Sequence, residues 1–452
     1  MADRVLVIGA DAAGMSAASQ ALRTAKAAGR DLDVIAVDRG HWTSYSACGI
    51  PYWIGGDVAS PGALVARTPE EHRANGIDVR LLTEAVAIDT EAGWVEVVDH
   101  AAGRRERFGY DQLVVATGAA PARPDVPGAD AAGVYGVQTL DDGGAVIAHL
   151  GGEVRCAVVV GAGYIGLEMA EALVRRGLSV TVVDRGPEPM NTLDPDLGTQ
   201  VHAAMERMGI DVVTSAAVTA FETAPGGGVA AVVTDVGTFP ADIVVLGTGV
   251  RPATDLARAA GLPLGPSGGL RTDDTQRVAD GVWAAGDCVE TWDRVRRDWV
   301  HVPLGTHANK QGRVLGTNLG GGAARFPGVV GTALTKVCDL ELARTGLTEG
   351  DAVEAGLDHV AVTIESTTRS GYLPGAEPIT VKMVAERPTG RLLGAQIVGR
   401  DDSAKRIDVC AMALWTELTV GELAMTDLAY APPFSSVWDP VQIAARKAAD
   451  RL

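Results

Sequence analysis

Short apolar runs rich in valine recur through the first two thirds of the chain, and each ends at a glycine turn or an acidic residue. Because these runs are continuously apolar rather than alternating, they are typical of parallel strands that are covered on both faces. Alanine-rich helical stretches lie between several of them. The pattern predicts an α/β protein with doubly wound parallel sheets. The runs are RVLVIGA, DVIAVD, QLVVATG, CAVVVGAG, SVTVVD, DIVVLGTG and GVWAAGD.

The strand–turn–helix pattern begins twice. VLVIGADAAGMSAASQAL near the N-terminus is answered farther along by AVVVGAGYIGLEMAEAL. Each unit is followed by a strand that ends in an acid, Asp38 in the first and Asp184 in the second. Two such units predict two Rossmann-like domains, each with its own dinucleotide site.

The pattern changes after about residue 330. HVAVTIES, PITVKMVAE and LLGAQIVG indicate consecutive strands with alternating polarity, and two amphipathic helices follow in SAKRIDVCAMALWTEL and TVGELAMTDLA. We expect an α+β C-terminal domain without a nucleotide turn.

The second glycine turn has the spacing G-x-G-x-x-G. Its first glycine permits a tight turn, its second lets a pyrophosphate approach the backbone, and its third lets the helix pack on the strand. Asp184 is expected to bond a ribose 2′-OH, which favours NADH over NADPH. Arg185 is either a solvated surface charge or a partner for a 2′-phosphate. The turn consists of Gly161, Ala162, Gly163, Tyr164, Ile165 and Gly166.

The first turn, Gly9-Ala10-Asp11-Ala12-Ala13-Gly14, is less regular, with Ala13 where a further glycine might stand. With Asp38 and the neighbouring Arg39 it still fits an adenine dinucleotide. Later segments support a flavin site, because Asp287 ends a strand where a carboxylate can accept bonds from a ribityl hydroxyl. The helix in VPLGTHANKQGRVLGTNL, with Pro303 expected in its first turn, directs its positive end at a reduced flavin. The remaining expected cofactor contacts are Ser44, Ala116, Thr117, Gly118, Gly249, Gly286 and Ala308.

Composition narrows the function classes. The chain has 452 residues, 47% of them hydrophobic, which predicts two to four domains at about 100–200 residues each. A formal net charge of −18 disfavours nucleic acid and anionic membranes as partners. No apolar run reaches the length of about 20 residues that spans a bilayer. MADRVLVIGA enters a strand at once, so we expect no signal peptide.

The five cysteines are odd in number and widely scattered, without a C-x-x-C pair. This pattern predicts neither a disulfide framework nor a metal site, and it favours a reducing, cytoplasmic location. They are Cys48, Cys156, Cys288, Cys338 and Cys410.

Cys48 lies in SYSACGIPY, with glycine and proline directly behind it and no second cysteine nearby. A helix is expected to begin in GIPYWIGG, so its positive end would lower the pKa of the thiol. Without an internal partner, the oxidised form is either a mixed disulfide with a small thiol or a sulfenic acid. The alternative is a buried, inert cysteine.

These segments together resemble the single-cysteine branch of the flavoprotein pyridine nucleotide–disulfide oxidoreductases, which holds coenzyme A-disulfide reductases, NADH oxidases and NADH peroxidases. GTALTKVCDLELARTGLTE, GYLPGAEP and YAPPFSSVWDPV also look like that branch. The resemblance implies an FAD domain formed by residues 1–120 and 250–329, an NAD(P)H domain over 121–249, and a homodimerisation domain over 330–452.

The resemblance also implies roles for single residues. Cys48 becomes the redox cysteine, Tyr164 the aromatic gate over the flavin, and Glu168 an acid near the nicotinamide. Tyr430 and Tyr372, from the partner subunit, become candidate proton donors to a leaving thiolate. The pattern departs from the branch at Leu373, where a second tyrosine is usual, and at Ala47, where asparagine is common. Gln20, Arg23 and Ser44 match positions that contact coenzyme A.

One position separates the possible reactions. Peroxidases and oxidases of this branch carry a histidine in the first glycine loop, where this chain has Ala12. The sequence therefore favours a FAD-dependent NAD(P)H:disulfide oxidoreductase that reduces a small-molecule disulfide, such as coenzyme A disulfide, or a persulfide. An NADH oxidase or diaphorase-type reductase is the first alternative, and a non-catalytic redox-sensing flavoprotein is the second.

Overall fold

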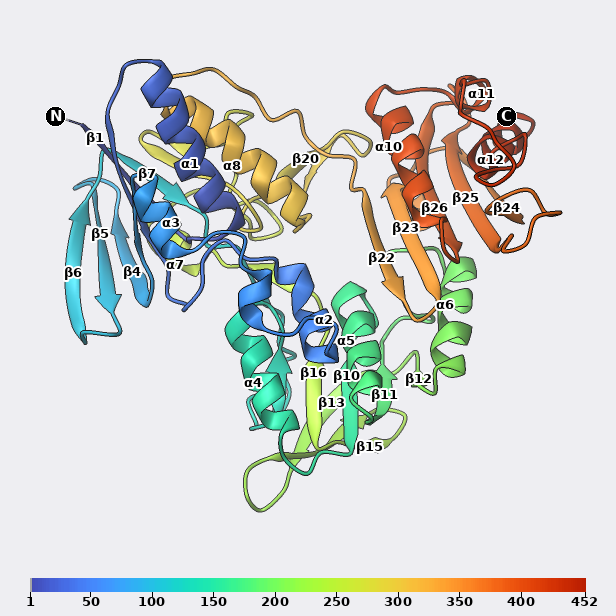
Figure 1. The fold of residues 1–452 in the computed structure, drawn as a ribbon, viewed down its shortest axis with the longest axis horizontal. Coiled ribbons are helices and arrows are strands. Elements are labelled where there is room, and N and C mark those ends of the chain that lie inside the picture. Colours follow the sequence, from blue (N-terminus) through green and yellow to red (C-terminus); the bar gives the residue numbers. More distant parts are fainter. Residues whose placement is uncertain (1) are drawn as a thin grey trace.

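The computed structural model describes residues 2–452 and builds them around three large sheets (Figure 1). The first sheet has six strands in the order β18-β19-β7-β1-β2-β3. Every neighbouring pair in it is parallel except β18 with β19. In sequence order its strands are β1 (Asp3–Ile8), β2 (Leu32–Val37), β3 (Ile77–Arg80), β7 (Gln112–Val115), β18 (Arg277–Ala279) and β19 (Val282–Ala284).

Two long helices cover one face of this sheet (Figure 1). They are α1 (Ala12–Ala27) and α8 (Gly305–Leu319). Gly316 lets them approach closely, because a Cβ built there would lie 2.3 Å from the Ala17 carbonyl oxygen. The other face packs against α7 (Asp255–Ala259) and a three-stranded sheet of β4 (Thr83–Asp89), β5 (Trp94–Asp99) and β6 (Arg104–Gly109). The short helix α3 (Pro69–Ala74) packs against β3.

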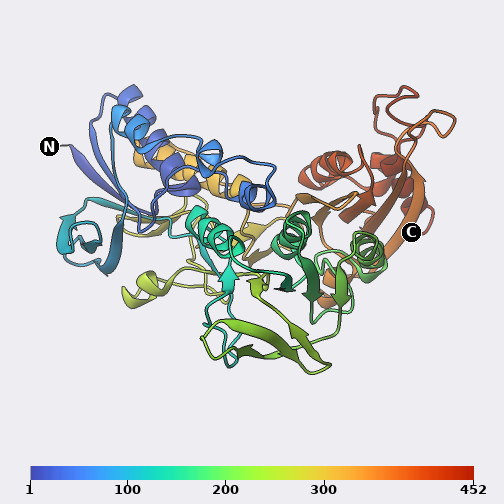
Figure 2. The same cartoon turned by 60° about the horizontal axis from the view of Figure 1, so that its bottom comes forward.

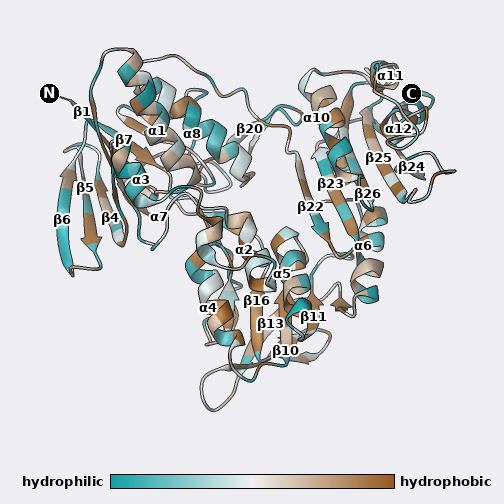
Figure 3. Cartoon of the chain, viewed as in Figure 1, coloured by the Kyte–Doolittle hydropathy of each residue, from teal (hydrophilic) through white to brown (hydrophobic). Residues whose placement is uncertain are grey.

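The second sheet has five strands in the order β12-β11-β10-β16-β9, all parallel. The strands β10 and β16 at its centre are apolar and, apart from Cys156, buried, and they are brown in Figure 3. Their bounds are β9 (Val134–Gly136), β10 (Cys156–Val160), β11 (Ser179–Val183), β12 (Asp211–Val213) and β16 (Ile243–Leu246). Around them lie α4 (Leu140–Leu150), α5 (Tyr164–Arg175), α6 (Pro195–Arg207) and the sheet of β13 (Val218–Thr223), β14 (Val229–Thr234) and β15 (Thr238–Pro240).

Small two-stranded sheets join these bodies, and a short helix bridges them. The sheets are β17 (Val250–Pro252) with β8 (Ala119–Pro121), and β20 (Thr291–Asp293) with β21 (Asp298–Val300). The helix, α2 (Ile50–Gly55), comes from the first body yet packs against α4 and α5 of the second. Its buried Ile50 and Ile54 belong to the same apolar core as the second sheet.

The third sheet is antiparallel, in the order β22-β23-β26-β25-β24. It occupies the opposite end of the molecule from the N-terminus (Figure 2). Its strands are β22 (Ala333–Val337), β23 (Leu340–Gly346), β24 (His359–Thr367), β25 (Pro378–Glu386) and β26 (Leu392–Gly399), and its helices are α9 (Glu349–Glu354), α10 (Ile407–Trp415), α11 (Val420–Ala424) and α12 (Pro440–Ala449).

The α/β class with two parallel sheets and a third α+β body is confirmed, but of the three strands expected to alternate only β24 does so. β25 and β26 are buried along nearly their whole length. The reason is tertiary: α10 and α12 pack on these strands, while Lys382 and Gln396 from them contact residues at the start of α6. Both faces of those strands are therefore covered. The prediction that Pro303 lies in the first turn of its helix is also wrong, since α8 begins at Gly305.

Candidate active site

A continuous cavity of about 3210 Å³ runs between the first two bodies and reaches the third. Ligand pockets in proteins usually measure about 300–1,000 Å³, so this space accommodates more than one large ligand. Cys48 and most of the predicted cofactor residues line it: Gly9, Asp38, Arg39, Ala116, Thr117, Gly118, Gly161, Gly163, Tyr164, Ile165, Glu168, Asp184, Arg185, Gly249, Gly286, Asp287 and Ala308.

Both glycine turns have the geometry of a dinucleotide turn. Gly9 has a φ of 104° and Gly161 a φ of 101°, which is the left-handed region that glycine tolerates best. A Cβ built at either Gly14 or Gly166 would lie 1.9 Å from the carbonyl oxygen of the first glycine of its turn. Gly163, by contrast, has no neighbour closer than 4.0 Å at that place, which leaves its backbone open to a ligand.

Asp38 and Asp184 hold these turns in equivalent ways. Asp184 accepts hydrogen bonds of 2.6 Å from the N–H of Ala162 and of Gly186. Asp38 accepts bonds of 2.8 Å from the N–H of Ala10 and of Gly40. Each carboxylate oxygen therefore has one backbone donor and retains a lone pair toward the cavity for a ribose hydroxyl.

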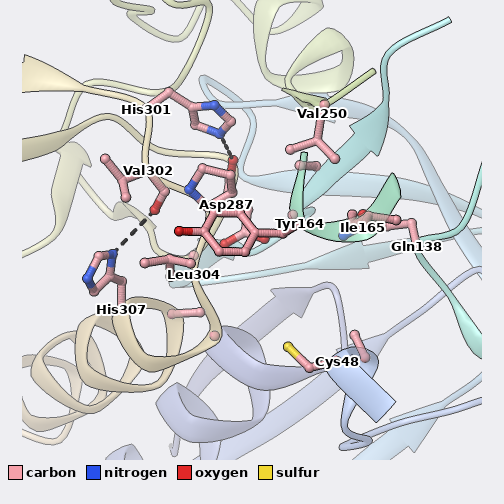
Figure 4. A pocket seen from close by; sticks show the side chains of 18 of the residues that line it. Cys48, Gln138, Tyr164, Ile165, Val250, Asp287, His301, Val302, Leu304 and His307 are labelled. Atoms are coloured by element: carbon pink, nitrogen blue, oxygen red, sulfur yellow. Dashed lines mark hydrogen bonds between the residues drawn. The ribbon is translucent and has the colours of Figure 1, made fainter. Parts of the chain in front are cut away.

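The segment before Cys48 is tied to the first glycine turn. Thr43 donates from its hydroxyl to the carbonyl of Ala10 at 2.5 Å, and the Tyr45 N–H donates to Asp11 Oδ1 at 3.1 Å. Cys48 then lies in a 3₁₀ turn directly before α2. Of the five free cysteines it alone is exposed, and its sulfur lies on the cavity side of α2 (Figure 4).

The pKa of the Cys48 thiol corrects the prediction from sequence. A helix does begin at Ile50, but the pKa of Cys48 is raised rather than lowered. Burial is the largest cause, followed by the negative charges of Glu168 and Asp287. Partial burial and two nearby carboxylates outweigh the short helix, because α2 has fewer than two turns.

Tyr164 and Glu168 stand one turn apart on α5 and face the cavity (Figure 4 shows Tyr164). The Tyr164 hydroxyl is buried without a hydrogen-bond partner among residues 2–452. Burial raises the pKa of Glu168, and the hydroxyl of Thr335 opposes that shift by donating to its Oε1 at 2.6 Å.

Asp287 lies on the other wall of the cavity (Figure 4). His301 Nε2 donates to its backbone carbonyl at 2.8 Å, and Gln311 of α8 accepts from the preceding Gly286 N–H at 2.8 Å. Burial raises the pKa of the Asp287 carboxyl, and His301 partly lowers it. The strand end and the start of α8 are thus held together, with Ala308 in the first turn of that helix.

The residues expected to contact coenzyme A lie outside the cavity lining. On α1, the exposed Arg23 donates to Gln20 Oε1 at 2.8 Å. Ser44 has a φ of 48° and pairs with His72. Ala10 and Gly166 also stand behind the lining, where they support the two turns.

Tyr372 and Tyr430 are both exposed, on two neighbouring loops of the third body. The Ser370 N–H donates to the Pro432 carbonyl at 3.0 Å, which fixes one loop on the other. Neither tyrosine lines the cavity of its own chain. Their predicted contribution to a neighbouring subunit's site stays a prediction.

Sequence reasoning missed the chemistry of Asp11. The two turns align at their first and last glycines, so Asp11, and not Ala13 as expected, takes the place that Gly163 has in the second turn. Burial raises the pKa of the Asp11 carboxyl to about 6, and the Tyr45 N–H bond counteracts part of this rise. An acid within a phosphate-binding turn was the available signal. His301 and His307, which line the same cavity, were also missed (Figure 4).

Comparison with known families was decisive. The model described as "Pyridine nucleotide-disulphide oxidoreductase" matches residues 3–312, and the model of the dimerisation domain of the same family matches residues 332–441. The chain belongs to this family. It is therefore an FAD-dependent oxidoreductase that uses a pyridine nucleotide, as its resemblance implied.

Individual relatives agree over nearly the full length of this flavoprotein. A protein of Pyrococcus horikoshii named "NAD(P)H coenzyme A polysulfide/persulfide reductase" is 36% identical over 99% of this chain and 98% of its own. A Methanocaldococcus jannaschii protein named "NADH oxidase" is 36% identical over 99% of each. The structure of a NAD-dependent persulfide reductase from A. fulgidus superposes with a TM-score of 0.95 at 38% identity, covering 99% of this chain and 83% of that one.

Within residues 2–452 of this flavoprotein, no helix combines the length and apolarity needed to cross a membrane. The same part of the chain contains no group of three or more His, Cys, Asp or Glu side chains arranged to hold a metal ion.

Proposed function

We propose that this flavoprotein reduces the sulfur–sulfur bond of a coenzyme A-linked disulfide or persulfide, with NAD(P)H as the electron source and Cys48 as the only redox-active sulfur of its chain. The observation that carries the proposal is the placement of one exposed cysteine in the cavity that both glycine turns also line. The names of the persulfide reductases among its relatives support this substrate class.

The cofactors are assigned to the three bodies. Residues 1–120 and 250–329 bind FAD, through the first glycine turn, Asp38 and Asp287. Residues 121–249 bind the nicotinamide coenzyme through the second turn, and residues 330–452 form the homodimer. The tight turns that only glycine permits at Gly9 and Gly161, and the open backbone at Gly163, fit such ligands. Bound FAD supplies the relay that passes two electrons from the nicotinamide to sulfur.

The protein's own groups carry out the sulfur chemistry. The Cys48 thiolate attacks one sulfur of the substrate disulfide, so a Cys48–substrate disulfide forms and the second sulfur leaves as a thiolate. Tyr430 of the neighbouring subunit, with Tyr372 beside it, gives that thiolate a proton. Two electrons and a further proton then return Cys48 to its thiolate and release the second sulfur as a thiol, with one NAD(P)H consumed and the tyrosine reprotonated from solvent.

Substrate binding is assigned to Gln20, Arg23 and Ser44. A guanidinium pairs with phosphate oxygens through two parallel N–H groups, which suits the phosphates of coenzyme A. The free state of all five cysteines fits a reducing compartment, and we assign the enzyme to the cytoplasm.

An NADH oxidase activity is the second candidate, because a relative of equal identity carries that name. Oxygen would then accept the electrons instead of a disulfide. Ala12 argues against this function, since the first glycine turn offers no histidine beside Cys48.

A Cys48→Ser variant tests the proposal, with Cys156→Ser as its control. We expect Cys48→Ser to retain bound flavin that NADH reduces, and to lose more than 99% of coenzyme A disulfide turnover. Cys156→Ser should keep both activities. An unchanged rate of disulfide reduction in Cys48→Ser would contradict the cysteine mechanism, and rapid oxygen uptake that survives this substitution would favour the oxidase.

A further inference from the structure

Ser44, four residues before the redox cysteine, forms a hydrogen bond with His72. The Ser44 hydroxyl lies 2.9 Å from His72 Nε2, and the serine backbone has a left-handed φ of 48°. The Ala66 N–H donates to the Ser44 carbonyl at 2.8 Å, which holds the segment around Ser44 against the chain that leads to His72. The contact is specific, because a left-handed serine is held in place only where its surroundings determine it.

His72 is deeply buried, at 1% exposure, on the short helix α3. Burial lowers the pKa of its imidazole, and the positive charge of Arg67 lowers it further. The ring is therefore neutral near pH 7 and carries one N–H. Its Nδ1 is also buried and has no hydrogen-bond partner within residues 2–452.

These contacts decide which nitrogen of His72 carries the proton. A proton on Nδ1 would leave a buried N–H donor without an acceptor, which is the rarer and costlier arrangement in proteins. A proton on Nε2 leaves only a bare acceptor nitrogen, and the N–H donates to Ser44 Oγ. The hydroxyl of Ser44 then cannot direct its own hydrogen at His72 and is left to donate it elsewhere.

We propose that His72 is a positioning residue that makes the Ser44 hydroxyl a hydrogen-bond donor to a phosphate oxygen of the substrate. The inference rests on the proposed function and adds to it the group that the serine recognises. Arg67 favours a phosphate as the group bound here. It directly follows Ala66, whose N–H bonds to Ser44, it is exposed, and it forms no ion pair with a carboxylate in the part of the chain that the structure describes.

Titration with coenzyme A measures directly how each substitution changes the affinity for the substrate. The titrations use Cys48→Ser holoenzyme as the background, so that no mixed disulfide forms. We expect Ser44→Ala and His72→Phe each to weaken the Kd about tenfold, the value of one hydrogen bond to a charged acceptor. His72→Gln, which keeps a donor near the Nε2 position, should stay within about twofold of the background.

A double variant separates positioning from mere packing. If His72 acts only through the serine, Ser44→Ala combined with His72→Phe binds no more weakly than Ser44→Ala alone. Effects that multiply, or a Kd unchanged by His72→Phe, would overturn the inference.

Nitrogen NMR of labelled histidine gives a readout that does not depend on the ligand. We expect the His72 signal of an unprotonated Nδ1 and a protonated Nε2, and the opposite tautomer would contradict the proposal even if His72→Phe fails to fold. Absence of coenzyme A binding to the background enzyme would instead contradict the proposed substrate, with the His72 tautomer then decided by the NMR signal.

Discussion

The hydroxyl of Thr335 on β22 donates a hydrogen bond of 2.6 Å to Glu168 Oε1 on α5. This bond joins the third body to the wall of the cavity near Cys48. Because Glu168 is also one of the two carboxylates that raise the pKa of Cys48, its charge state affects the reactive sulfur directly. The dimerisation body thus contributes to the electrostatics of the active site.

Glu168→Gln should lower the pKa of the Cys48 thiol. The amide removes a negative charge near the sulfur, while its oxygen still accepts from Thr335. The pH dependence of Cys48 alkylation by iodoacetamide measures the shift, with a faster reaction expected at neutral pH. Glu171→Gln, on the same helix but not among the groups that shift Cys48, serves as the control. Equal alkylation profiles for Glu168→Gln and wild type would show that the carboxylate does not act on the sulfur.

Asp184→Asn should reduce the preference for NADH. An asparagine has one acceptor oxygen, so the N–H of Ala162 or of Gly186 loses its partner, and the negative charge that disfavours a 2′-phosphate disappears. We expect KM for NADH to rise about tenfold, as for one lost hydrogen bond, and KM for NADPH to rise less. Steady-state kinetics with both coenzymes test this prediction. As the matched comparison, Arg185→Gln should affect only NADPH, and an unchanged coenzyme ratio in Asp184→Asn would refute the assignment.

Lys382→Met should destabilise the contact between the second and third bodies. The buried Nζ lies within 2.9 Å of Asp196 and Glu349 and 3.2 Å from Asp194, so its removal leaves carboxylates facing one another. Loss of about 3–5 kcal/mol is expected for breaking a buried ion pair. Thermal unfolding measures it, and Lys405→Met, at an exposed pair with Asp408, should change stability by less than about 0.5 kcal/mol.

The same cluster gives a pH dependence. Burial alone would raise the pKa of Asp194, but the Gln396 amide, backbone N–H groups and Lys382 outweigh it and lower that pKa below its usual 3.8. A carboxyl with a lowered pKa adds stability above its unfolded pKa and loses it as the pH falls through the folded value. The difference in Tm between wild type and Lys382→Met should therefore narrow below about pH 4. A difference that grows as the pH falls would contradict this reading.

Gly316→Ala should separate the two helices that cover the first sheet. The added Cβ would meet the Ala17 carbonyl oxygen at 2.3 Å, and backbone cannot give way as a side chain can. Overpacking of this kind costs about 1–3 kcal/mol, which urea unfolding detects. Gly144→Ala in α4 is the matched control, since its Cβ meets only Trp53 at 3.8 Å and alanine favours the helix by about 1 kcal/mol. Equal stability of the two variants would exclude close helix contact.

The two glycine turns and the acids that hold them could be predicted from the sequence because their signals are local. The turns at Gly9 and Gly161 need a left-handed backbone, and the acids at Asp38 and Asp184 follow their strands at fixed positions. Their hydrogen bonds to the turns therefore agree with the motif. The direction of the Cys48 pKa was wrong, because the charges that decide it come from a distant helix and a distant strand end.

By itself, the sequence determined the two nucleotide turns, the parallel strands around them and the single cysteine placed after the first unit. These follow from backbone conformation and from burial of continuous apolar runs, both of which depend on neighbouring residues. Only the tertiary structure decided that Glu168 and Asp287 surround the Cys48 sulfur, that His72 pairs with Ser44, and that both faces of β25 and β26 are covered. Such relationships depend on burial and charge between groups far apart in the chain, and no spacing in the sequence records them.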